Sequence, residues 1–238
     1  MKKKPAVIAV TDNMGPEHKL QQYLRWLQSD GTNVECAVLS YEHDDGSALE
    51  QCGGLVLTGG GDVDPALYGG QAGHPNIYSL DRKRDDFERT LIDRALKAKI
   101  PILGICRGFQ LANVHYGGSL FEDLSENGFP DHETEKENER RHEVNVEPGS
   151  ELARMTGKVA GEVNSYHHQG INKPGQNLRV VSRSKDGLPE ALELIESSTN
   201  NFFLLVQWHP ERMQDTENPF TQKILRSFLS SIIEKTKE

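Results

Sequence analysis

Short apolar runs alternate with helix-periodic stretches over the first two-thirds of this chain. Residues 7–10 form a continuous apolar run, the pattern of a strand covered on both faces, and residues 34–39, 55–57 and 100–105 read as the next strands. Residues 81–98 give the clearest helical pattern, with their apolar positions on one face. This strand–helix rhythm predicts an α/β three-layer sandwich with a mostly parallel central sheet.

The later part of the chain has a different character. Residues 131–143 are nearly all charged or polar and are expected to form a solvated loop. An amphipathic helix is expected at the C-terminus, with apolar side chains from Phe220 to Ile232 packing on the sheet. Shorter strands of more antiparallel type are expected at residues 142–146, 178–182, 191–195 and 202–207.

Bulk properties exclude several classes of protein. The length of 238 residues suits one domain, residues 1–238. The formal charge of −9 argues against nucleic-acid binding, because such a field repels phosphates. The apolar run at residues 5–10 is too short for a signal segment or a membrane span. An odd count of three cysteines favours a reduced, cytoplasmic setting.

One cysteine stands where a strand is expected to turn into a helix. Cys106 lies between Gly104 and Gly108, directly after residues 100–105. A nucleophile in such an elbow has strained backbone angles and needs small neighbours. The elbow raises the sulfur above the carboxyl edge of the sheet, and the positive pole of the following helix favours the thiolate. Cys106 is therefore the expected nucleophile.

A histidine at the end of another expected strand can serve as its base. The apolar residues 202–207 lead into His209, Pro210 and Glu211. Pro210 restricts the backbone of His209 to the extended region. Residues two apart in an extended segment share a face, so Glu211 can reach one ring nitrogen of His209. That contact would set the tautomer and stabilise the imidazolium, which predicts a triad with Cys106.

A glycine-rich segment follows the expected strand at residues 55–57. Glycine lets the backbone approach a ligand closely, and acyl transfer needs N–H donors for the oxyanion. We expect one donor from the glycines of residues 58–62 and the other from Arg107. The segment has neither a GxGxxG nor a Walker pattern, so phosphate binding is not predicted.

Other polar clusters are interpreted as structural. His167 and His168, together with His132, His142 and the acidic loop, could suggest a metal site. Adjacent histidines in a strand point to opposite faces, however, and neither HExxH nor CxxC spacing occurs. No metal and no cofactor are therefore expected. Four carboxylates are assigned loop-fixing and salt-bridge roles, and two cysteines are interpreted as small buried apolar residues: Asp62, Asp64, Asp85, Asp86, Cys36 and Cys52.

With these residues in place, the chain resembles the class I glutamine amidotransferase-like superfamily. More narrowly, it is similar to the γ-glutamyl-γ-aminobutyrate hydrolase branch of peptidase family C26. The resemblance implies a flavodoxin-like fold over nearly the whole chain. Its matching segments are residues 57–69 (LTGGGDVDPALYG), 81–91 (DRKRDDFERTL), 101–124 (PILGICRGFQLANVHYGGSLFEDL), 163–170 (VNSYHHQG) and 206–211 (VQWHPE).

The resemblance also implies a role for each matching site residue. It assigns Cys106 as nucleophile, His209 as acid and base, Glu211 as the orienting carboxylate, and the backbones of Gly60 and Arg107 as oxyanion donors.

Further implied contacts concern the substrate. Gln110 would contact the glutamyl moiety, and the backbone around Tyr166 and His167 would hold its α-carboxylate end. The implied partner is a small γ-glutamyl amine, as in polyamine and putrescine catabolism. Neither a nucleic acid nor a membrane is expected, and a homodimer is compatible with the sequence.

Three functions remain open at this point. The leading one is a hydrolase that cleaves a γ-glutamyl amide, such as γ-glutamyl-γ-aminobutyrate, to glutamate and amine. The second is a glutaminase subunit that supplies ammonia to a partner synthase, although the sequence carries no fused synthase domain. The third is a degenerate binding protein, against which the intact Cys106, His209 and Glu211 positions count.

Overall fold

The computed structural model describes residues 4–43, 46–129, 132, 140–195 and 201–235. Its α-helices are α1 (Glu17–Leu27), α2 (Arg82–Lys97), α3 (Arg107–His115), α4 (Glu151–Thr156) and α5 (Pro219–Lys235), with short 3-10 turns η1 (Ser47–Gln51), η2 (Pro65–Leu67), η3 (Ser125–Asn127) and η4 (Pro210–Arg212). Its strands are β1 (Ala6–Thr11), β2 (Val34–Leu39), β3 (Gly54–Leu57), β4 (Ile102–Ile105), β5 (Ser119–Phe121), β6 (Arg140–Val146), β7 (Ala160–Ser165), β8 (Gly170–Lys173), β9 (Leu178–Ser184), β10 (Pro189–Leu194) and β11 (Phe203–Val206).

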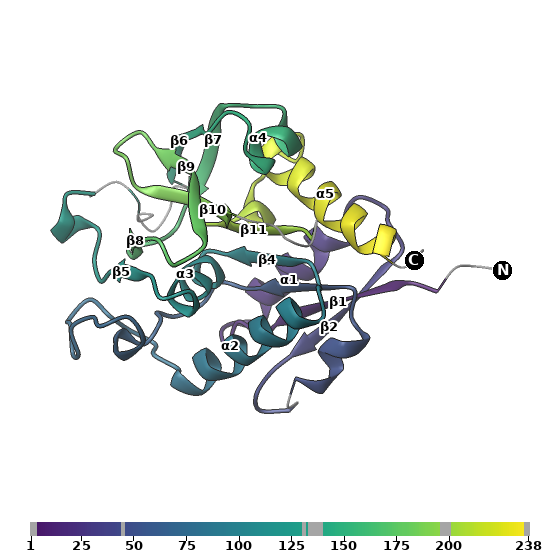
Figure 1. Ribbon diagram of the computed structural model, residues 1–238, viewed down its shortest axis with the longest axis horizontal. Helices are drawn as coiled ribbons and strands as arrows, with labels where there is room; N and C mark the ends of the chain where they lie inside the picture. Colours follow the sequence, from purple (N-terminus) through teal and green to yellow (C-terminus); the bar gives the residue numbers. More distant parts are fainter. Residues whose placement is uncertain (1–3, 44–45, 130–131, 133–139, 196–200, 236–238) are drawn as a thin grey trace.

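Nine strands form one mixed sheet in the order β2-β1-β3-β4-β11-β10-β9-β6-β7 (Figure 1). The pairings from β2 to β11 are parallel, whereas those from β11 to β7 are antiparallel. The carboxyl ends of β1, β3, β4 and β11 therefore share one edge, which is where such sheets bind ligands.

Two apolar cores lie on opposite faces of the sheet and make it the middle of three layers. One core joins the sheet to α1, α4 and α5, and the other joins it to α2 and α3. Figure 1 shows α5 lying along the sheet near β10 and β11. The expected α/β three-layer fold is confirmed.

Local sequence accounts for both boundaries of α2. Asp81 precedes α2, and its side chain accepts a hydrogen bond from Arg84 N at 3.1 Å, which caps the first turn. Lys99, at φ 55°, has left the helical region just beyond the last turn. The apolar periodicity of residues 81–98 thus located this helix to within one residue at each end.

The sheet is less parallel than the sequence pattern predicted. Half of its pairings are antiparallel because β9 and β10 form a hairpin, and because β6 and β7 pair antiparallel with α4 between them. Elements that the sequence reading did not identify are α4, β7 and the two-stranded sheet of β5 with β8. Each is short, and strand segments such as AGEVNS carry little apolar periodicity.

The polar segment 131–143 was expected to be a solvated loop, and this is wrong at both of its described parts. Residues 140–143 begin β6, and His132 is only 2% exposed. Residues 131 and 133–139 lie outside the described residues.

No helix in the described part of the chain has both the length and the apolar character needed to cross a membrane.

Candidate active site

Cys106 occupies a sharp turn between β4 and α3. Its backbone has φ 53° and ψ −105°, a conformation that L-residues rarely adopt, and its N–H donates to Val206 O at 2.9 Å. Because β11 holds this amide, the turn is fixed beside the end of the neighbouring strand. The side chain is largely buried, at the N-terminus of α3.

Steric contacts explain why glycine occupies positions 104 and 108 around the turn. A Cβ at Gly108 would lie 2.3 Å from Leu57 O, and one at Gly104 would lie 2.6 Å from Leu205 Cδ2 and 3.0 Å from Gly108 O. Any larger residue would force the helix away from β3. The expectation of small neighbours around the nucleophile is therefore met.

His209 follows β11 and faces Glu211. His209 Nδ1 lies 2.7 Å from Glu211 Oε1, and both side chains are buried. The backbone of His209, at φ −109° and ψ 85°, avoids the helical region as Pro210 requires. A carboxylate at Nδ1 leaves Nε2 as the ring atom that faces reacting groups.

The backbone of His209 is held by Asn164 of β7. Asn164 Oδ1 accepts from His209 N at 2.9 Å, and Asn164 Nδ2 donates to His209 O at 2.9 Å. The ring of Tyr166 packs edge-on against the imidazole, with ring centroids 5.7 Å apart, and Arg212 lies over the tyrosine ring at 5.2 Å. Asn164 was not singled out from the sequence, although it lies in the matching segment 163–170.

Cys106, His209 and the glycine segment converge on one point. A Cβ at Gly59 would lie 3.0 Å from His209 Cε1 and 3.7 Å from Cys106 Cβ. The hydroxyl of Tyr23 lies there too, 2.9 Å from Gly59 N and 3.5 Å from His209 Nδ1. Only a glycine leaves room beside the two side chains, and no sequence signal indicated Tyr23, which reads as an apolar helix position.

The electrostatics of the pair support a charged imidazole. Burial disfavours charge on His209, but Glu211 and then Cys106 outweigh it and raise the pKa of His209 above its usual value. Burial likewise opposes ionisation of Glu211, but His209 lowers the pKa of that carboxyl. The stability from Glu211 is lost as pH falls through its lowered pKa, and that from His209 is lost as pH rises through its raised pKa. The pair is therefore most stabilising between the ordinary pKa values of the two groups.

Replacing Glu211 with glutamine is expected to lower the pKa of His209, because the largest stabiliser of the imidazolium is removed. The alkaline limb of the profile of kcat/KM against pH should move to lower pH, and kcat should fall by roughly 10²–10⁴-fold. Steady-state kinetics over a pH series measure both effects.

Glu162→Gln is the matched control, because Glu162 lies on the exposed side of β7 and pairs only with Arg141 at 3.5 Å in the described residues. Its profile should match that of the unaltered protein. An unmoved alkaline limb in Glu211→Gln would contradict the electrostatic role of Glu211.

Two backbone N–H groups, one next to Gly59 and one next to Cys106, are left without an acceptor among the described residues. The N–H groups of Gly60 and Arg107 donate to no acceptor in the described part of the chain. A Cβ at Gly60 would lie 2.1 Å from Arg84 Nη1 and 3.0 Å from Asn13 O, so this position also requires glycine. Both donors follow carboxyl ends of strands, where an oxyanion could be bound.

The side chain of Arg84 holds the glycine segment in place through hydrogen bonds. Its guanidinium donates to Asn13 O at 2.9 Å, to Gly59 O at 2.9 Å and to Thr58 Oγ1 at 3.1 Å. The contact to Gly59 O, with a further one to Thr58 O at 3.4 Å, fixes the peptide planes on either side of Gly59, directly before Gly60. The structure buries Arg84 beneath the loop.

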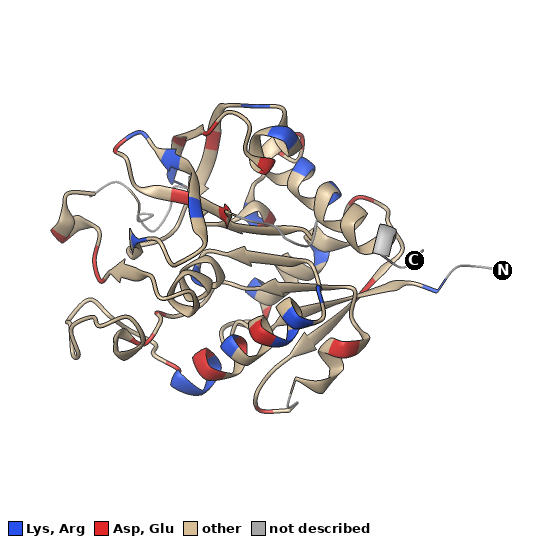
Figure 2. Ribbon diagram, in the orientation of Figure 1, with Lys and Arg blue, Asp and Glu red and all other residues tan. Residues whose placement is uncertain are grey.

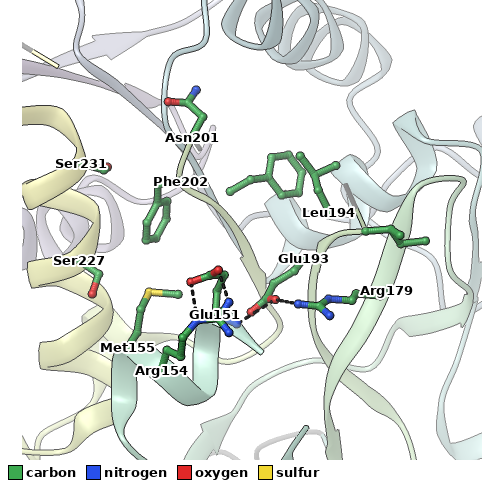
Figure 3. A pocket seen from close by; sticks show the side chains of 12 residues that line it. Glu151, Arg154, Met155, Arg179, Glu193, Leu194, Asn201, Phe202, Ser227 and Ser231 are labelled. Atoms are coloured by element: carbon green, nitrogen blue, oxygen red, sulfur yellow. Dashed lines mark hydrogen bonds and ion pairs between the residues drawn. The ribbon is translucent and has the colours of Figure 1, made fainter. Parts of the chain in front are cut away.

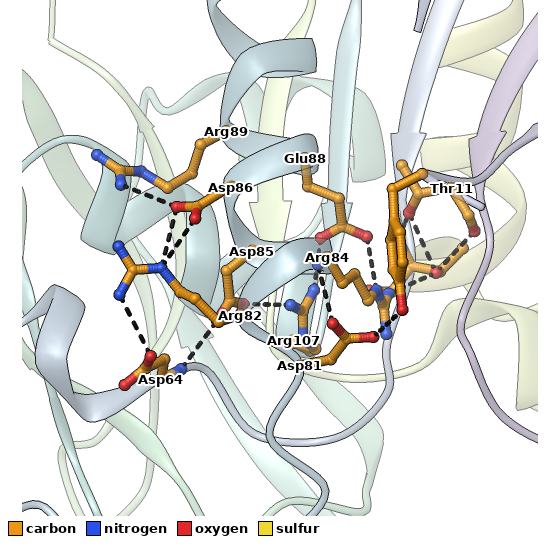
Figure 4. A network of polar contacts seen from close by, with 12 residues as sticks. Thr11, Asp64, Asp81, Arg82, Arg84, Asp85, Asp86, Glu88, Arg89 and Arg107 are labelled. Atoms are coloured by element: carbon orange, nitrogen blue, oxygen red, sulfur yellow. Dashed lines mark hydrogen bonds and ion pairs between the residues drawn. The ribbon is translucent and has the colours of Figure 1, made fainter. Parts of the chain in front are cut away.

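A buried ion network connects Arg84 to Arg107, the residue after Cys106 (Figure 4). Glu88 contacts both Arg84 and Arg107, and Arg107 also contacts Asp85. Burial opposes ionisation of Glu88, but Arg107 and Arg84 lower the pKa of that carboxyl. The backbone N–H of Arg107 thus lies at the site, while its side chain is held in the ion network. The sequence predicted the first role of Arg107 but not the second.

The sequence pattern of α2 could have indicated this ion network. Arg84, Asp85 and Glu88 fall on the same helical stripe as the apolar Leu91 and Ile92. Charged residues on a buried stripe must be paired. Figure 2 shows basic and acidic residues interleaved along α2.

Gln110 lies in α3, one turn after the nucleophile. Its Nε2 donates to Gln169 O at 3.0 Å and to Gln207 Oε1 at 3.2 Å. Gln207 Nε2 in turn lies 3.6 Å from Cys106 Sγ. Gln207, which was quoted only as part of the segment 206–211, thus belongs to the site.

The structure separates the two substrate contacts expected around residue 166. Tyr166 lies beside His209, but His167 does not approach the reacting groups: its N–H donates to His132 O at 3.2 Å, and its ring lies near Glu190. The side chain of His168 instead contacts Asp62 Oδ1 at 3.0 Å. The two adjacent histidines therefore serve different parts of the protein.

The remaining acidic residues and cysteines are structural. Asp64 caps η2 and pairs with Arg82 at 3.3 Å, and Asp86 also pairs with Arg82, at 3.0 Å. Burial raises the pKa of Cys36 to about 11, which keeps this thiol protonated and unreactive. Cys52 is buried and donates to Ala48 O at 3.3 Å.

A cavity of about 580 Å³ lies away from these groups (Figure 3). Its walls come from α4, α5, β9, β10 and the start of β11, including Met155, Glu193 and Phe203. Cys106 follows the carboxyl end of β4, whereas Phe203 pairs with Ile102 at its amino end. The cavity is therefore at the opposite edge of the parallel strands and takes no part in the site.

Comparisons of fold agree with the architecture described above. A Thermoplasma acidophilum protein described as a putative GMP synthase subunit superposes with a TM-score of 0.68 at 18% identity, over 100% of both chains. The glutaminase domain of Trypanosoma brucei CTPS superposes with a TM-score of 0.62 at 16% identity, over 96% of this chain and 94% of that one. At these identities the likeness shows the fold alone.

Sequence comparisons are more specific. The chain is 40% identical over 182 residues to "Putative glutamine amidotransferase-like protein YvdE" of Lactococcus lactis subsp. lactis, covering 75% of this chain and 74% of that protein. It is 35% identical over 192 residues to "Gamma-glutamyl-gamma-aminobutyrate hydrolase PuuD" of Escherichia coli K12, covering 77% and 73%. The profile of the family described as Peptidase C26 matches residues 9–211. The chain therefore belongs to the peptidase C26 family.

Proposed function

We propose that this chain is a cysteine-dependent hydrolase of γ-glutamyl amides of small amines, such as γ-glutamyl-γ-aminobutyrate. The observation that carries the proposal is the convergence of Cys106, at a strained turn, with the buried His209–Glu211 pair beside Gly59. A nucleophile, a base and an orienting carboxylate at the ligand-binding edge of a sheet form the machinery of acyl transfer.

In the first half-reaction, the Cys106 thiolate attacks the γ-carbonyl carbon of the substrate. The carbonyl oxygen becomes an oxyanion, and the N–H groups of Gly60 and Arg107 donate to it. The protonated His209 gives its proton to the amide nitrogen, the C–N bond breaks and the amine leaves. The product of this step is a γ-glutamyl thioester on Cys106 and a neutral His209.

In the second half-reaction, a water molecule takes the place of the amine. His209 accepts a proton from this water as its oxygen attacks the thioester carbonyl. The C–S bond then breaks, glutamate leaves, and the ion pair of Cys106 with His209 is restored. Glu211 stays ionised throughout and stabilises the imidazolium at each stage.

Recognition of the glutamyl group is proposed to involve Gln110 and Tyr166. The Nε2 of Gln110 already donates to Gln169 O and Gln207 Oε1, so its Oε1 is the atom left to accept from a substrate ammonium. Tyr166, beside His209, borders the path of the leaving amine. His167 is not part of this proposal, because its backbone donor already contacts His132.

Released glutamate, measured with γ-glutamyl-γ-aminobutyrate and with glutamine as separate substrates, tests the proposal. We expect a higher kcat/KM for γ-glutamyl-γ-aminobutyrate, because a hydrolase that acts alone needs no partner to become active. Activity on glutamine alone would favour the glutaminase subunit instead. If the folded protein turned over neither substrate, the hydrolase assignment would be rejected.

A further inference from the structure

A second polar cluster lies buried outside the catalytic group. It consists of His132, His142 of β6, His167 after β7 and Glu190 of β10, and we call it the histidine cluster. Glu190 is fully buried, and the side chains of His132, His142 and His167 are 2%, 14% and 2% exposed. The catalytic mechanism uses none of these side chains.

The distances within the histidine cluster are unusual for hydrogen bonds. Glu190 Oε1 lies 3.5 Å from His132 Nδ1 and 3.6 Å from His167 Nε2, and Glu190 Oε2 lies 3.4 Å from His142 Nε2. None of these atoms has a hydrogen-bond partner within the described residues. Ligands around a tetrahedral Zn²⁺ at 2.0–2.1 Å are about 3.3–3.4 Å from one another, close to the three distances from Glu190 to the histidines.

The other ring nitrogens of two histidines are already engaged. His132 Nε2 lies 2.9 Å from Asp186 Oδ2, and His167 Nδ1 lies 3.0 Å from Gln169 O. A carboxylate or carbonyl at one nitrogen fixes the tautomer that presents a lone pair on the other, which is how metal-binding histidines are held. The free lone pairs then belong to His132 Nδ1 and His167 Nε2, which face Glu190.

Charge balance also calls for a cation. A fully buried carboxylate without hydrogen bonds is unfavourable by several kcal/mol. One protonated imidazole would neutralise Glu190 but would leave the facing nitrogens of the other two histidines without partners.

We propose that His132, His142 and Glu190, with His167 as fourth ligand, bind a divalent cation of the zinc class. Candidate ligand atoms of the first three all lie within 4.8 Å of one another. Three imidazoles and one carboxylate suit Zn²⁺, and four protein ligands leave no open position for catalysis. The site is therefore structural.

The metal would connect segments that lie far apart in the chain. It would join residue 132 and β6 to β10 and to the turn after β7. That turn carries Tyr166, which packs on His209, and Gln169, whose carbonyl accepts from Gln110. Binding would thus hold one wall of the active site without contact to Cys106.

Metal content and thermal stability of the purified chain test this site. We expect about one zinc ion per chain by plasma mass spectrometry after reconstitution with Zn²⁺ and removal of excess metal. Stripping with a chelator should lower the Tm, and added Zn²⁺ should restore it. Co²⁺ in its place should give the visible absorption of a tetrahedral complex.

Variants locate the metal. Glu190→Gln and His142→Ala should bind Zn²⁺ at least about tenfold more weakly. His115→Asn is the matched control and should keep the metal, because His115 also pairs with a carboxylate, Asp93 at 3.2 Å, but lies outside the histidine cluster. Cys106→Ala should keep it too, which excludes binding by the catalytic thiolate.

Two outcomes would overturn the proposal. One is a reconstituted wild-type chain that holds no zinc and keeps the same Tm with chelator and with Zn²⁺, a result that needs no variant to fold. The other is zinc that is lost in Cys106→Ala but retained in Glu190→Gln.

Discussion

Replacing Cys106 with alanine is expected to abolish hydrolysis of γ-glutamyl amides, with a loss of roughly 10⁴–10⁶-fold in kcat. The other two cysteines lie within β2 and before β3, and neither follows the carboxyl end of a strand as Cys106 does. The melting temperature should hardly change, because alanine removes only the sulfur and keeps the backbone contact to Val206 O. Release of glutamate and thermal unfolding are the two measurements.

Cys52→Ala is the matched control, since Cys52 is equally buried but lies before β3, away from the site. It should keep full activity. Hydroxylamine gives a further check, because it should trap the glutamyl group as a hydroxamate only while Cys106 is present. Turnover by Cys106→Ala would show that another residue is the nucleophile.

Replacing Glu88 with glutamine is expected to lower the free energy of unfolding by about 3–5 kcal/mol. Glu88 is the carboxylate shared by Arg84 and Arg107. Without its charge, Asp85 is the one carboxylate left in contact with this pair among the described residues, and it contacts Arg107 alone. Urea unfolding followed by circular dichroism measures the change, provided that the slope with denaturant stays constant.

Asp86→Asn, on the same helix, is the control. Asp86 has a side chain that is 54% exposed and pairs with Arg82 at the surface, so its replacement should change stability by less than about 1 kcal/mol. Similar small losses in both variants would mean that water reaches the network around Glu88.

The fold was largely predictable because its strongest elements are also its most periodic. The helix at residues 81–98 and the apolar strands carry enough buried positions to be recognised locally. The antiparallel half of the sheet was understated, and α4, β7 and the pair β5–β8 were missed. Their stability comes from tertiary pairing, such as that of β6 with β7, and not from their own composition.

The candidate site likewise has a part that local sequence could predict and a part that depends on tertiary structure. Local chemistry in the sequence determined the strained turn at Cys106 and the proximity of His209 and Glu211, because steric restriction and a two-residue spacing act within a few residues. The catalytic roles of these residues remain predictions until the variants are measured.

Only the tertiary structure decided which distant side chains complete the site. Arg107 meets Asp85 across 22 residues, Asn164 holds His209 across 45, and His132 meets Asp186 across 54. Such contacts depend on the order of strands in the sheet and on which helix covers which face, and no local pattern encodes either. For this protein, the sequence by itself determined which groups are expected to react, whereas the tertiary structure decided the ion network beneath them and the histidine cluster beside them.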